Sequence, residues 1–170
     1  NLNSSCMMIT NTKDSYISTF AYDSKNEQNL SKSHPSLYYR HPDLIGKPTS
    51  LLIKKGLGKE EEERYTKHDI YSLGVLMYEI ITTASLIKLF GKISRQDKTN
   101  IMSTNYKGFL FSKYDTEKED FDSKYEIEGI RKIIEKCIDT TNSYSSMNEV
   151  LSDLDKLPIH QNNEHKYEID

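Results

Sequence analysis

The sequence has no tryptophan, and only two of its 170 residues are cysteines. The two cysteines, Cys6 and Cys137, are too few for a disulfide framework and show none of the spacings of a zinc site. Five histidines stand at positions 34, 41, 68, 160 and 165. They form no HExxH or similar local pair, so spacing alone predicts no metal site.

Long apolar runs are also absent. No run approaches the ~20 residues that a membrane helix needs, and no signal-like segment opens the chain. The net charge is only -3, with acidic and basic residues interspersed, which argues against nucleic-acid binding. We therefore expect a cytoplasmic protein without a membrane segment. The chain opens on Asn1 instead of Met, so we also expect a fragment of a longer protein.

The longest apolar pattern lies in residues 69–83 and leaves almost no polar face. A helix with this pattern is covered on all sides, so we expect a buried central helix here. Asp69 stands where an N-cap residue would lie, and Thr82 and Thr83 weaken the far end.

Residues 126–157 carry two further helical stripes. Isoleucines and Cys137 recur at steps of three and four between Ile127 and Ile138, which predicts a helix of about twelve residues. Ser146 and Glu149 have the spacing of a capping box before a second stripe, which Pro158 ends. Residues 158–170 form a polar tail, and the fold class is mainly α.

The remaining segments have weaker patterns. Short apolar runs at 6–9 and 16–20, with a polar turn between them, predict a β-hairpin near the N-terminus. The acidic block around Glu60–Glu63 indicates a solvated loop or a short helix tip. Residues 84–90 favour a short helix or loop, and residues 91–125 favour irregular structure with one short helix.

Two ordered motifs resemble those of eukaryotic protein kinases. Asp69-Ile70-Tyr71-Ser72-Leu73-Gly74 is similar to the Asp-x-Trp-Ser-x-Gly that opens the central helix of the kinase large lobe. Tyr39-Arg40-His41-Pro42-Asp43 is similar to the Tyr-x-Ala-Pro-Glu that closes the activation segment. The motif residues are Tyr39, Pro42, Asp43, Asp69, Ser72 and Gly74.

The resemblance implies that residues 1–157 are the C-terminal lobe of a protein kinase-like domain. In that arrangement, residues 1–21 are the catalytic-loop and hairpin region, and residues 22–43 are the activation segment. Residues 69–83 are the central helix, and residues 126–157 are the C-terminal helices.

At the catalytic positions the family's residues are missing. Ungapped spacing sets Asn1 on the catalytic aspartate, Cys6 on the metal-binding asparagine and Thr19 on the metal-binding aspartate. An amide cannot act as a base near neutral pH, and a thiol and a hydroxyl are poor magnesium ligands. We therefore predict no intact catalytic residue and neither a cofactor nor a metal for this chain.

Arg40-His41-Pro42-Asp43, together with His68 before the central motif, is similar to one subgroup of the family. These are degenerate kinase-like domains of fungal proteins that carry HeLo-type cell-death or other incompatibility modules. In the family an arginine in the C-terminal region pairs with the acid at the Asp43 position. Tyr144 stands nearest to that place here, so another arginine reaches Asp43 or the contact is lost.

The resemblance leaves two functions open. In the first, the parent is a pseudokinase, and this lobe is a scaffold or regulatory module in signalling for a protein partner or a neighbouring effector domain. In the second, the chain is a fragment of an active ATP- and magnesium-dependent Ser/Thr/Tyr kinase, with intact catalytic motifs upstream of Asn1. Whether the parent is an enzyme stays open, and no activity is expected from this chain alone. A helical interaction domain without kinase ancestry is the remaining alternative.

Overall fold

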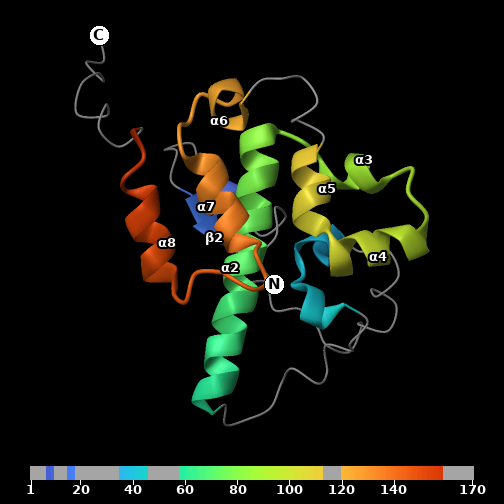
Figure 1. Ribbon diagram of the computed structural model, residues 1–170, viewed down its shortest axis with the longest axis horizontal. Coiled ribbons are helices and arrows are strands. Elements are labelled where there is room, and N and C mark those ends of the chain that lie inside the picture. Colours follow the sequence, from blue (N-terminus) through green and yellow to red (C-terminus); the bar gives the residue numbers. More distant parts are fainter. Residues whose placement is uncertain (1–6, 10–14, 18–34, 46–57, 113–119, 159–170) are drawn as a thin grey trace.

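The computed structural model describes residues 7–9, 15–17, 35–45, 58–112 and 120–158 (Figure 1). These residues are mainly helical, which confirms the predicted class. Two short strands, β1 (Met7–Ile9) and β2 (Ser15–Ile17), pair antiparallel near the N-terminus. Asn1, Cys6 and Thr19 lie outside the described residues, as do most of the predicted activation segment and the polar tail from residue 159.

The longest helix, α2 (Lys59–Thr82), runs through the middle of the molecule (Figure 1). It begins well before Asp69, so the prediction that Asp69 caps this helix is wrong. The N-cap is Gly58, and Asp69 is an exposed residue inside the helix. The residues from Lys59 onward are good helix formers without a breaker, and the acids of the first turn complement the helix dipole.

The far end of α2 lies where the paired threonines predict it. Thr83 adopts the left-handed conformation, with φ 51, and its amide donates to the Ile80 carbonyl. The Thr82 hydroxyl donates to the Tyr78 carbonyl at 2.6 Å. The chain then turns into α3 (Leu86–Phe90), in the range where a short helix was one of two options.

Residues 91–125 contain more helix than the sequence predicts. They form α4 (Arg95–Thr104), α5 (Tyr106–Ser112) and α6 (Phe121–Lys124). Ser94 caps α4, since its hydroxyl oxygen accepts from the Asp97 amide at 3.2 Å. Phe109 packs on Phe90 of α3, and Phe121 packs on Phe111 and Tyr125; burial of these rings stabilises helices that show no clear apolar period.

The two C-terminal helices are α7 (Ile130–Cys137) and α8 (Met147–Leu154). α7 is shorter than the predicted helix because Gly129 has φ 85 and so starts the helix late. α8 begins at the predicted cap, where the Ser146 hydroxyl oxygen accepts from the Glu149 amide at 3.4 Å. The Glu149 carboxylate accepts from the amide of Ser145, not of Ser146, at 3.0 Å.

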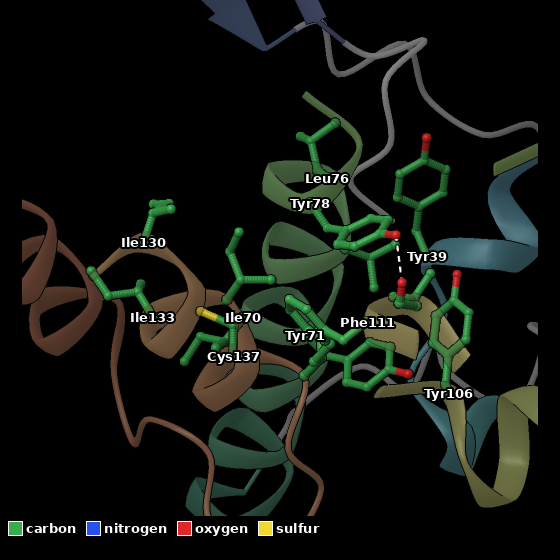
Figure 2. Packing of buried hydrophobic residues seen from close by; sticks show 14 of the residues in the cluster. Tyr39, Ile70, Tyr71, Leu76, Tyr78, Tyr106, Phe111, Ile130, Ile133 and Cys137 are labelled. Atoms are coloured by element: carbon green, nitrogen blue, oxygen red, sulfur yellow. Dashed lines mark hydrogen bonds between the residues drawn. The ribbon is translucent and has the colours of Figure 1, made fainter. Parts of the chain in front are cut away.

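The core packs on both sides of α2 from Ile70 onward (Figure 2), but Ile80 keeps 50% of its surface exposed, so the prediction of a helix covered on all sides is wrong. On one side Ile70 lies beside Cys137 of α7, and on the other Tyr71 lies toward Tyr106 of α5. The Tyr78 hydroxyl, which is fully buried, donates to the Leu110 carbonyl at 2.7 Å. In the described part of the chain, no helix is long and apolar enough to cross a membrane.

Candidate functional site

The segment from Tyr39 to Asp43 lies against α2 and joins the two sequence motifs. It runs from the end of one short 3-10 helix, η3 (Pro35–Tyr39), into a second, η4 (Pro42–Leu44), and the fixed φ of Pro42 suits the first turn of η4. The Ser72 hydroxyl of α2 lies 2.8 Å from the Tyr39 carbonyl and 3.0 Å from the His68 carbonyl. One proton is shared between these two acceptors, so Ser72 ties the segment to the helix.

Tyr39 makes a second contact with α2. Its ring is buried, and its hydroxyl donates to a carboxylate oxygen of Glu79. The other Glu79 oxygen accepts from the Leu86 amide at the start of α3, at 3.3 Å. Glu79 therefore joins three elements, because η3 and α3 both donate to one side chain of α2.

His41, Asp43 and His68 form a cluster next to Ser72. The two imidazole rings are buried and their centroids lie 4.7 Å apart. One oxygen of the Asp43 carboxylate lies 3.6 Å from His41 Nδ1 and 4.0 Å from His68 Nε2. The Asp43 side chain keeps 59% of its surface exposed, so the cluster opens to solvent on the carboxylate side.

The charge state of His41 follows from its surroundings. Burial lowers the pKa of His41, Asp43 opposes this shift, and Arg64 and Lys67 add to it. A neutral ring fits the hydrogen bond at Nδ1, which accepts from the Asp43 amide at 3.2 Å. A nitrogen that accepts this bond has no proton for the carboxylate, so the 3.6 Å approach is a contact between neutral ring and carboxylate.

The structure answers the question of the partner of Asp43. Within the described residues, no arginine forms an ion pair with Asp43, and two histidines stand beside its carboxylate. Tyr144, near the family's arginine position, points elsewhere: its hydroxyl donates to Asp153 of α8 at 2.9 Å. Lys136 Nζ lies 4.0 Å from the centroid of the Tyr144 ring.

Gly74 lies on the opposite side of α2, against α7. A Cβ at this position would lie 2.5 Å from Cys137 Cβ and 2.9 Å from Ile138 Cγ2, closer than real side chains approach. Glycine therefore permits the close contact between α2 and α7. Asp69, by contrast, is exposed on α2, so the structure brings Tyr39, Asp43 and Ser72 together and leaves Asp69 outside this group.

A small cavity of about 210 Å³ adjoins the segment. Pro42 and Tyr71 line one part of it, and α4, α5 and the turn after α7 line the rest. Lys107 Nζ lies 2.7 Å from Asp139 Oδ2 in its wall, and this contact lowers the pKa of Asp139, with help from the amides of Asn142 and Thr141. The pair gives the cavity a polar wall.

Comparisons with models of known protein families, with curated proteins and with solved structures find no match for this chain. The contacts described above therefore carry the functional argument. Local spacing in the sequence does not predict the histidine cluster, because His41 and His68 lie in different elements. The sequence does carry one signal for it. His41 lies within the Tyr39–Asp43 motif and His68 directly precedes the Asp69–Gly74 motif, and the resemblance implies that these two motifs lie close together.

Proposed function

We propose that this chain is the large lobe of a protein kinase-like domain and that it works as a pseudokinase. Its role is that of a scaffold or regulatory interaction module in signalling. The observation that supports this most is the hydrogen bond from Ser72 to the Tyr39 carbonyl at 2.8 Å. It joins the two motifs on which the resemblance rests, and the resemblance requires the end of the activation segment to dock on the central helix.

The position of α2 supports the same proposal. A kinase large lobe is built around one buried central helix, and here α2 contacts both η3 and α7. Gly74 belongs to the motif and permits the approach of α7, so the motif glycine has a physical reason to be there. The histidines at Asp43 depart from the family's arginine pair, which fits a divergent member.

Loss of catalysis is proposed from residue chemistry. The positions aligned with the family's base and metal ligands carry Asn1, Cys6 and Thr19. An uncharged amide does not take the substrate's proton, and a thiol with a hydroxyl does not replace hard anionic oxygen at magnesium. A fold that keeps its docking contacts while it lacks these groups is suited to binding a protein partner or a neighbouring effector domain.

The test is a thermal-shift measurement on the full-length gene product with ATP, with and without magnesium. We expect no magnesium-dependent rise in Tm, since a ligand raises Tm only if it binds the folded state. Radiolabelled ATP should transfer no phosphate to the protein or to a generic substrate. A magnesium-dependent rise of several degrees would contradict the pseudokinase and favour the active-kinase alternative.

A matched variant checks the alignment itself. Asn1→Asp, Cys6→Asn and Thr19→Asp together restore the family's residues at the three positions. If the alignment is right, this triple variant should gain a magnesium-dependent rise that the parent lacks. If neither protein responds, the assignment of these three positions is wrong.

A further inference from the structure

We propose that His41, Asp43 and His68 form a zinc-binding site. One ligand atom from each residue lies within 4.8 Å of the others. His41 and Asp43 belong to the docked segment, and His68 belongs to α2, so one ion would join the two elements. The proposal rests on this geometry and does not depend on the proposed kinase-like function.

The donor set fits zinc. Zn²⁺ takes imidazole nitrogen and carboxylate oxygen, commonly as three protein ligands with a fourth position left for water. Magnesium and calcium favour sets made only of oxygen atoms, which two imidazoles do not provide. Two histidines and one aspartate therefore select a zinc-class transition metal over the hard cations.

The three ligand atoms lie within 4.8 Å of one another, so both the Asp43 carboxylate and the imidazole rings must move toward a bound ion. Ligand atoms around tetrahedral zinc lie about 3.3 Å apart, given metal-ligand distances near 2.0 Å. The Asp43 oxygen already lies 3.6 Å from His41 Nδ1 and 4.0 Å from His68 Nε2. Asp43 is mostly exposed, so its carboxylate can rotate toward an ion between the rings without disturbing the core.

The surroundings hold the two rings in place. The Tyr71 ring lies edge-on to His41 at a centroid distance of 5.1 Å, and the Tyr65 ring lies edge-on to His68 at 6.2 Å. Coordination through His41 Nδ1 would replace its hydrogen bond from the Asp43 amide, whereas coordination through Nε2 would keep it. Arg64 and Lys67 lower the pKa of His41, so they also oppose the charge of a cation at this place, and an anionic fourth ligand such as hydroxide or a carboxylate would offset that repulsion.

The experiment is a titration of the chelator-treated, purified chain with Zn²⁺ in competition with a chromogenic chelator. We expect one equivalent to bind, and Co²⁺ in its place to give the visible absorption bands of a tetrahedral ion. Asp43→Asn should lower the affinity at least about tenfold, since loss of an outer-shell partner alone costs that much. His68→Gln should do the same.

Two controls separate this site from adventitious binding. Asp69→Asn removes an exposed carboxylate from the same helix and should leave the affinity unchanged. His160→Gln with His165→Gln removes the histidines near the C-terminus and should also change nothing. Circular dichroism checks folding, and Asp43→Asn keeps the test valid if the buried His68→Gln fails to fold. Wild-type affinity in Asp43→Asn, or loss of binding in the double histidine variant, would overturn the proposal.

Discussion

The two sides of α2 are held by different forces. Toward α7, Gly74 lies against Cys137 and Ile138, and the contact is apolar and close. Toward the 39–43 segment, the Tyr39 ring is also buried, but α2 adds hydrogen bonds through Ser72 and Glu79. Figure 2 shows the two sides together, with Ile70 beside Cys137 and Tyr39 across the helix.

Apolar contacts and hydrogen bonds contribute differently to stability and to position. The free energy gained from apolar burial is proportional to the buried area, and much of it is lost when a buried side chain is made smaller. A hydrogen bond contributes only about 0.5–1.5 kcal/mol net, but it fixes the direction of its partners. We therefore infer that α7 stabilises α2, whereas the segment is positioned by a few polar contacts and can be released separately.

The largest expected effect comes from opening the apolar side. Ile134 of α7 is fully buried, so Ile134→Ala should lower the free energy of unfolding by about 2–5 kcal/mol, because a cavity remains. Urea denaturation measures this. Ile87→Ala is the control, since Ile87 is 54% exposed and should lose less than about 0.5 kcal/mol. Equal losses in the two variants would contradict the assignment of the core.

The next effect comes from overpacking the same side. Gly74→Ala should cost about 1–3 kcal/mol, because its Cβ would overlap Cys137 and α7 would have to shift. Gly58→Ala meets no atom within 4 Å and should cost less than about 1 kcal/mol, the preference of an N-cap for glycine over alanine. A Gly74→Ala protein as stable as the parent would show that the two helices are further apart than described.

A substitution on the polar side of α2 should lower the free energy of unfolding by less. Ser72→Ala removes the hydroxyl that reaches Tyr39 and should cost about 1 kcal/mol in urea denaturation. Ser103→Ala is matched to it, because the Ser103 hydroxyl also donates to a carbonyl four residues earlier but is exposed. We expect no loss there, since alanine is the better helix former. Similar costs for the two serines would mean that the contact with Tyr39 contributes nothing.

The smallest effect concerns a charged contact at the end of α7. Lys107 and the neighbouring amides lower the pKa of Asp139, so the folded state favours its carboxylate. This contribution is complete above the ordinary pKa of 3.8 and is lost as the pH falls toward the lower folded value. Asp139→Asn should cost under about 1 kcal/mol at pH 7, because solvent screens the pair. The difference in the free energy of unfolding between Asp139→Asn and the parent should narrow between pH 4 and pH 2. A difference that stays constant over this range would show that it does not come from the lowered pKa of Asp139.

The helices with strong local signals could be predicted from the sequence. The stripe of α7 and the Ser146 cap of α8 are local features, and both helices lie where these signals place them. The start of α2 was missed because Asp69 is a good cap residue, while the helix formers before it continue the helix to Gly58. Residues 91–125 were missed because tertiary packing of aromatic rings stabilises their helices.

The site could be predicted only in part. The motif resemblance named Tyr39, Asp43 and Ser72, and in the structure Ser72 contacts Tyr39 while Asp43 lies beside His68, four residues before Ser72 on α2. No spacing rule could place His68 beside His41, because that proximity depends on how η4 docks on α2. Long-range contacts of this kind come from the fold and not from local sequence.

We infer from these contacts that the 39–43 segment is held on α2 independently of α7. Hydrogen-exchange mass spectrometry of the parent and of Ser72→Ala tests it most directly, because exchange resolves local opening from global unfolding. We expect faster exchange in residues 35–45 and no change in α7. Unchanged exchange in 35–45, or an equal increase in α7, would contradict it.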